Sequence, residues 1–133
     1  MRLIACLALA LSAAPAFAAD RHIKAAFIGP GVFATEPDCR RLEALAAGAV
    51  RNLDSVPEKL TEDGIVGWEN GCFFTKVTEQ TKGRVWVARM NCGEGAQNWR
   101  ETRTFRPGAN GSWQVTLRRR STQYLRCETK LGQ

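Results

Sequence analysis

The chain of 133 residues is poor in the side chains on which most catalytic sites depend. It contains a single histidine, His22, near the start of the chain. One histidine excludes ribonuclease chemistry that uses two histidines, and it excludes a histidine-rich metal site. A serine or cysteine nucleophile activated by histidine would have to use this one residue. We therefore predict a protein without a metal site and without a cofactor.

Long hydrophobic runs are missing after the first 18 residues. That first segment joins Arg2, an apolar run over residues 3–14, Pro15 and the small residues Ala16 and Ala18. This order is typical of a secretory signal peptide and predicts cleavage after Ala18. A membrane anchor would need about 20 apolar residues. We expect an exported, soluble protein, periplasmic or secreted from a bacterium, with one domain over residues 19–133.

Removing the leader removes one of the five cysteines and leaves an even number. In an exported chain of this length, four cysteines predict two disulfides, for which three pairings are open. A hairpin formed by residues 72–79 and 84–92 would bring Cys72 near Cys92 and leave Cys39 for Cys127. Closing these two loops would stabilise the fold by about 3 and about 4.5 kcal/mol. A zinc site is not expected, because no Cys-x-x-Cys spacing occurs.

The distribution of apolar residues predicts one helix followed by strands. Thr35 and Pro37 are typical of a helix start, and apolar residues then recur every three or four positions from Leu42 to Leu53. Beyond Gly64 the pattern favours six short strands, at residues 65–68, 72–78, 84–92, 99–106, 112–118 and 122–128. The predicted fold class is α+β, with the N-terminal helix packed on one face of a twisted antiparallel sheet, a meander of about five to six strands.

Positive charge is concentrated in the second half of the chain. Residues 19–80 carry 7 basic and 10 acidic side chains, whereas residues 81–133 carry 11 basic and 3 acidic ones. Arginine matches carboxylate, sulfate and phosphate groups in two-point contacts, which favours a binding surface for an anionic partner. The residues predicted to form it are Arg100, Arg103, Arg106, Arg118, Arg119, Arg120 and Trp99. The alternative is that these arginines are solvated and protect sheet edges from aggregation.

The leading functional hypothesis is a small, exported, non-enzymatic binding protein that could serve as an inhibitor. Its expected partner is an anionic ligand, such as lipopolysaccharide or an acidic polysaccharide, or an acidic protein. Nucleic acid is not expected, because the sequence shows neither an aromatic RNA-binding strand pattern nor a basic recognition helix. One alternative is a cell-wall or sugar-acting hydrolase that uses carboxylates among Glu62, Asp63, Glu69 and Glu79. The other is a structural component of the cell envelope.

Overall fold

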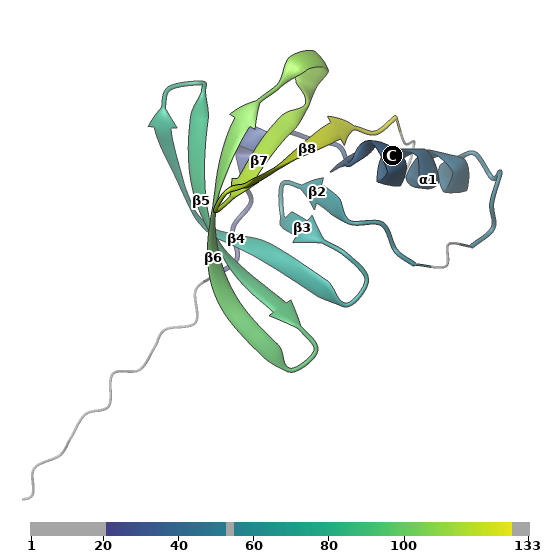
Figure 1. Cartoon of the computed structure of the whole chain (residues 1–133), viewed down its shortest axis with the longest axis horizontal. Helices are drawn as coiled ribbons and strands as arrows, with labels where there is room; N and C mark the ends of the chain where they lie inside the picture. The colour runs from purple at the N-terminus through teal and green to yellow at the C-terminus, as the bar shows by residue number, and fades with distance from the viewer. Residues whose placement is uncertain (1–20, 53–54, 129–133) are drawn as a thin grey trace, which may run out of the picture.

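Eight strands pair in chain order, and the last strand pairs with the first, so the sheet closes into an antiparallel barrel (Figure 1). The computed structural model describes residues 21–52 and 55–128, and the predicted leader lies outside them. The strands are β1 (Phe33–Ala34), β2 (Lys59–Thr61), β3 (Gly64–Val66), β4 (Asn70–Thr81), β5 (Val85–Glu94), β6 (Gln97–Pro107), β7 (Trp113–Leu117) and β8 (Arg120–Arg126). The α-helix α1 spans Glu36–Ala46, and two 3-10 helices, η1 and η2, span Ala26–Ile28 and Ala109–Gly111.

The barrel interior is lined by alternate residues of the longer strands, most of them apolar. In β5, Ala88, Met90 and Cys92 are buried while Arg89 between them is exposed. Side chains of a strand point alternately to its two faces, so this pattern indicates that one face of the strand packs in the barrel interior. The interior is filled by side chains of every strand, and its largest fully buried members are Tyr124, Phe33, Phe74 and Phe105.

The segment before β1 also contributes to the barrel core. Residues 26–28 form the 3-10 helix η1, and only Ile28 of them is fully buried. The ring of Phe27 stacks on Trp86 at 5.0 Å and meets Phe74, Phe105 and Trp113 edge-on. This aromatic cluster packs against the inner face of the sheet, where the helix was expected to pack.

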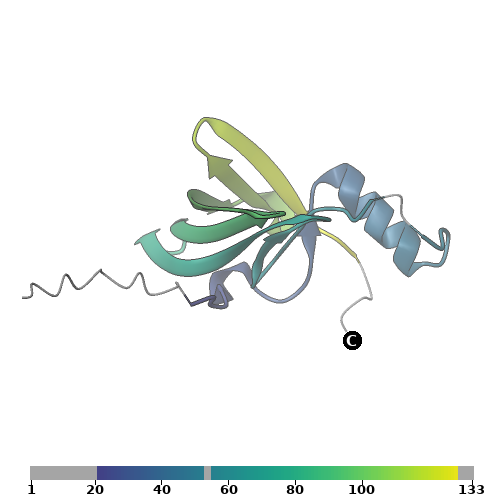
Figure 2. The same ribbon diagram turned by 90° about the horizontal axis from the view of Figure 1, so that it is seen from below.

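The predicted fold class, a helix packed on the face of an open sheet, is therefore wrong. The six predicted strands are present as β3 to β8, but β1 and β2 close the sheet around its own core. Figures 1 and 2 show α1 outside the barrel, at one side of it. It contacts β1 and β8 and buries only Cys39 and Leu42.

The helix is also shorter than predicted, because it ends before the apolar pattern does. Gly48 has a φ of 74°, and its N–H donates to the Leu45 carbonyl while the Ala49 N–H donates to the Ala44 carbonyl. These two bonds form a Schellman motif, which stops a helix at a glycine. Thr35 occupies the N-cap position, although its side chain makes no capping hydrogen bond.

The two predicted disulfides are present. Cys72 and Cys92 lie directly opposite each other on β4 and β5, and their sulfurs are joined. Cys39 of α1 is joined to Cys127, just after β8, across a separation of 88 residues. The second link fixes the helix to the strand pair that closes the barrel. Two intramolecular disulfides indicate a protein that matures in an oxidising environment.

Candidate functional site: an arginine-lined cleft

A cleft of about 870 Å³ lies between β6 and the turn that joins β7 to β8. We call it the arginine cleft, and its lining residues are Trp99, Arg100, Glu101, Thr102, Leu117, Arg118, Arg119 and Arg120. Five of the seven residues predicted from the sequence to bind an anion are among them. The cleft thus brings together two arginine-bearing segments that are 15 or more residues apart in the chain.

The cleft exists because β7 is shorter than β6. β7 pairs with β6 only from Thr104 to Pro107, whereas β5 pairs with β6 along residues 97–105. After Leu117 the chain turns back into β8, and the β7–β8 hairpin diverges from β4, β5 and β6 (Figure 2). No strand in the described part of the chain therefore lies beside residues 97–103 of β6 on this side, which we call the open edge of β6.

The turn at the cleft holds an arginine in an unfavourable backbone conformation. Arg118 has a φ of 56°, and it is the first of the two residues between β7 and β8. Two-residue hairpin loops with positive φ at this position normally have glycine, asparagine or aspartate there. A non-glycine residue in the left-handed region costs about 1–2 kcal/mol. Such strain at a surface turn points to a role for the side chain.

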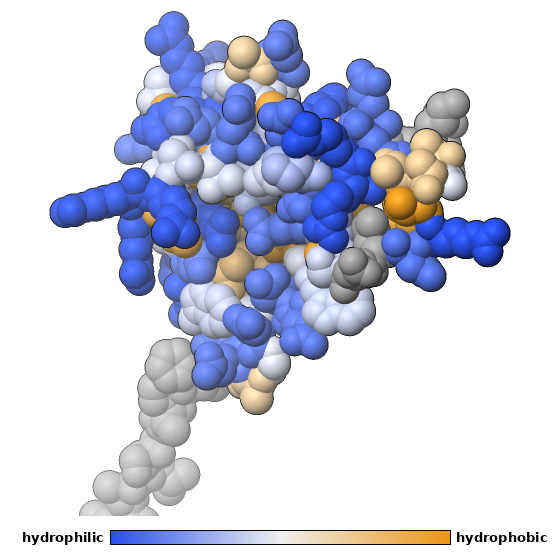
Figure 3. Space-filling view, turned by 45° about the vertical axis from the view of Figure 1, so that its right-hand side comes forward, coloured by the Kyte–Doolittle hydropathy of each residue, from blue (hydrophilic) through white to orange (hydrophobic). Residues whose placement is uncertain are grey.

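The arginines of the turn are available to a ligand. Arg118, Arg119 and Arg120 are exposed, and none of them forms an ion pair with another described residue. Arg100, in contrast, already has an interaction within the protein. The side chain of Trp99 is 37% exposed at the opposite wall. The face in Figure 3 is largely hydrophilic, with small hydrophobic areas.

The inner face of β6 carries a polar network rather than free charges. Glu101 accepts hydrogen bonds from Trp99 Nε1 at 2.7 Å and from Arg103 Nε at 2.9 Å. The side chains of Arg103 and Glu101 are only 15% and 14% exposed, and Arg103 Nη2 lies 2.8 Å from the carboxylate. Arg103 was predicted to be a surface binding residue, but in the structure its guanidinium forms an ion pair with Glu101 beneath the cleft.

Glu58 and Tyr124 meet close to this network. The Tyr124 hydroxyl donates to Glu58 Oε1 at 2.6 Å, and these residues are 66 positions apart. Burial raises the pKa of the Tyr124 phenol, and the hydrogen bond to Glu58 and its negative charge raise it further, while Arg103 lowers it. A cavity of about 70 Å³ is lined by Glu58, Glu101, Arg103 and their neighbours. It is large enough for a few water molecules and not for a substrate.

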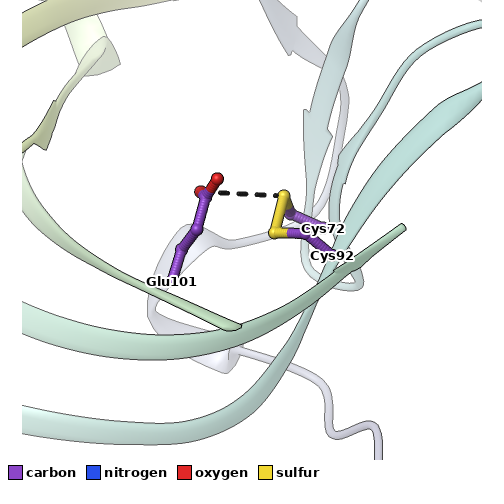
Figure 4. Close-up of side chains that lie close together, drawn as sticks. All are labelled: Cys72, Cys92 and Glu101. Atoms are coloured by element: carbon purple, nitrogen blue, oxygen red, sulfur yellow. Dashed lines mark hydrogen bonds between the residues drawn. A yellow bond between two sulfur atoms is a disulfide. The ribbon is translucent and has the colours of Figure 1, made fainter. Parts of the chain in front are cut away.

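The disulfide of β4 and β5 borders the same network (Figure 4). Glu101 points at the sulfurs, with one carboxylate oxygen 3.8 Å from Cys72 Sγ. Cys72, Cys92 and Glu101 form the one group of three potential metal-ligating side chains among the described residues. Because the two sulfurs are bonded to each other, they offer no thiolate to a metal.

The remaining predicted residue, Arg106, is exposed on the outer face of β6, opposite Gln114, and does not line the cleft. The carboxylates proposed for a hydrolase are not gathered either. Asp63 lies 3.7 Å from Lys24, Glu69 accepts from the Trp68 indole, and Glu79 accepts from the Gly83 amide. The contacts of Asp63, Glu69 and Glu79 lie at different turns.

A second hollow, of about 470 Å³, lies on the outer face of β4, β5 and β6. Gly71 and Gly93 lie opposite each other in this hollow, and neither has a side chain to fill it. At its border the ring of His22 stacks on Phe73 at 4.7 Å. This hollow places the single histidine beside an aromatic ring.

Sequence reasoning missed Glu58, Glu101 and Tyr124. For Glu101 a signal was present, because it alternates with Trp99, Arg103 and Phe105 on one face of β6. Glu58 and Tyr124 give no such signal, since their contact depends on barrel closure. No helix among the described residues is long and apolar enough to cross a membrane. No protein-family model, curated protein or solved structure matches the chain.

Proposed function

We propose that the chain is a small exported binding protein that holds an anionic ligand, or an acidic surface of a protein partner, in the arginine cleft. The observation that supports this most is the position of Arg118, Arg119 and Arg120, which face Trp99 across one cleft of about 870 Å³. A cavity of this size lies within the range that ligand sites occupy. Arginine forks and an adjacent indole bind phosphate, sulfate or carboxylate groups together with a flat apolar surface.

The proposed compartment is the periplasm or the outside of the cell, reached through a signal peptide at residues 1–18. The disulfides support this, because such bonds persist where the environment is oxidising. In that compartment, lipopolysaccharide, acidic polysaccharides and acidic proteins are the anionic partners to consider. If the partner is an enzyme with an acidic groove, occupation of that groove by the hairpin would make the protein an inhibitor.

The experiment compares two triple variants that lower the net charge equally. The first is Arg118→Asn, Arg119→Gln, Arg120→Gln, where asparagine tolerates the positive φ of position 118. The second is Arg84→Gln, Arg89→Gln, Arg106→Gln, which changes three exposed arginines that do not line the cleft. Binding to immobilised heparin and to lipopolysaccharide is measured at several salt concentrations.

We expect the cleft variant to bind about 10- to 100-fold more weakly, because each exposed ion pair contributes up to about 1 kcal/mol. The control variant should lose much less, and the difference between the two should shrink as salt screens the charges. Equal losses in both variants would show that only net charge matters, and the proposed site would then be wrong.

A further inference from the structure

We infer that the arginine cleft takes an extended acidic peptide, which adds as a strand to the open edge of β6. This inference rests on the proposed function and names its partner. The lining of the cleft is the first indication. Neighbouring residues of β6 line it, among them Trp99 and Glu101 of the inner face and Thr102 of the outer face. A ligand that meets both faces of a strand lies along its edge, where the main chain is presented.

The main chain at this edge is ready for pairing. β5 occupies one side of β6, and β7 leaves the other side before Thr104, so residues 97–103 have no strand neighbour there. None of the main-chain hydrogen bonds made by loops and turns of the described chain involves these residues. A strand rises about 3.3 Å per residue, so the open edge is about 20 Å long and offers pairing to roughly six residues.

The charge at the end of this edge selects the occupant. A peptide antiparallel to β6 would continue the line of β7, with its first residues against the turn that carries Arg118 and Arg119. Acidic side chains there would meet the arginines. A second copy of the chain would instead bring two arginine turns and two positively charged molecules together, which opposes edge-to-edge pairing. The added strand needs the main chain of β6 and the arginines of the turn, not the Arg100 side chain.

Strand addition differs from simple charge attraction because it depends on the peptide main chain. The probe is the acetylated, amidated peptide Glu-Thr-Asp-Val-Thr-Val. Two modified forms carry N-methyl groups on alternate residues, one form on the odd positions and one on the even positions. Only one of the two sets can direct its N–H groups at β6. Binding is measured by calorimetry, and amide exchange of residues 97–103 is followed by nuclear magnetic resonance.

We expect the parent peptide to bind, one N-methylated form to bind at least about tenfold more weakly, and the other to bind like the parent. Alternate amides of residues 97–103 should become protected from exchange. The Arg118→Asn, Arg119→Gln, Arg120→Gln variant should also weaken peptide binding, whereas the Arg84→Gln, Arg89→Gln, Arg106→Gln control should not.

Other outcomes separate this inference from the proposed function. If both N-methylated forms bind like the parent, or lose affinity equally, the strand model is overturned while the cleft remains an anion site. If heparin binds through the arginines and the peptide does not, the occupant is a polysaccharide and the strand model is again wrong. If neither probe distinguishes the cleft variant from the control, both proposals fail.

Discussion

Arg118 occupies a backbone conformation that suits glycine, and its replacement by glycine should make the protein more stable. The φ of Arg118 is 56°, whereas Arg119, the other residue of the turn, is not among the residues with positive φ. The left-handed conformation costs an L-residue about 1–2 kcal/mol, and glycine adopts it without that cost. The neighbouring residue therefore provides a matched control in the same turn.

The two glycine variants should change the free energy of unfolding in opposite directions. Glycine makes the unfolded chain more flexible, which lowers stability by about 0.5–1 kcal/mol at either position. In Arg118→Gly the relief of strain exceeds this loss, and the free energy of unfolding should rise by about 0.5–1 kcal/mol. In Arg119→Gly there is no strain to relieve, so it should fall by about 0.5–1 kcal/mol. Each variant removes one positive charge from the same turn, so the electrostatic change largely cancels in the comparison.

Urea denaturation with intact disulfides measures the difference, which should be about 1–2 kcal/mol. For a domain of this size, 1 kcal/mol corresponds to a shift in Tm of roughly 4 °C. Heparin binding by Arg118→Gly should weaken at the same time, because the variant loses a cleft arginine. If Arg118→Gly is no more stable than Arg119→Gly, position 118 is not strained and the argument that function retains an arginine there fails.

Three further predictions concern the barrel itself. Gly64 has a φ of 152°, and a Cβ added there would clash with the Cys72 carbonyl oxygen. Urea denaturation should therefore show that Gly64→Ala lowers the free energy of unfolding by more than about 2 kcal/mol. In the control Gly83→Ala the added Cβ meets no atom, and the loss should be about 1 kcal/mol or less. Tyr124 is the only tyrosine, so the ultraviolet absorbance of phenolate reports on it alone. Because burial raises its pKa, the folded protein should show no phenolate at pH 10.5, while the chain unfolded in urea titrates near about 10. The neutral phenol contributes fully to the free energy of unfolding below the pKa of the unfolded chain, and this contribution is lost as the pH rises above that pKa. The Tyr124→Phe variant should therefore lose less stability than the native protein at alkaline pH. Replacing Cys39 and Cys127 by serine removes a link across 88 residues and should lower the free energy of unfolding by about 4.5 kcal/mol. Replacing Cys72 and Cys92, which are 20 residues apart, should lower it by about 3 kcal/mol. Equal Tm values for the two variants, or a lower Tm for the second, would contradict the loop-entropy reasoning.

The strands that the sequence failed to reveal are those that decide the architecture. β1 and β2 have two and three residues, which is too short for alternation to be recognised. They became strands because Phe33 and Leu60 pair with each other and both enter the core, contacts that exist only once the rest of the sheet has curved around. The longer strands are recognisable from their own sequences, as the alternation of Ala88, Arg89, Met90, Asn91 and Cys92 in β5 shows.

The candidate site could also be predicted from the sequence only in part. The concentration of arginine after residue 81 is a property of the sequence, and it identified most of the residues that line the arginine cleft. It did not separate Arg103, which pairs with Glu101 beneath the cleft, from Arg118, which is exposed at the turn. Strand alternation with Phe105 assigns Arg103 to the inner face, so this difference could have been read from the sequence.

By itself the sequence determined the strands with two distinguishable faces, the four cysteines that form the disulfides, and the excess of positive charge in the second half of the chain. These are local or compositional properties, and they hold wherever the segments lie. Only the tertiary structure decided that the sheet closes on itself, that α1 stays outside it, and that β7 ends early enough to leave an edge of β6 beside three arginines. Each of these depends on pairing between residues far apart in the chain, where the energy of a contact is realised only after other contacts have placed its two partners together.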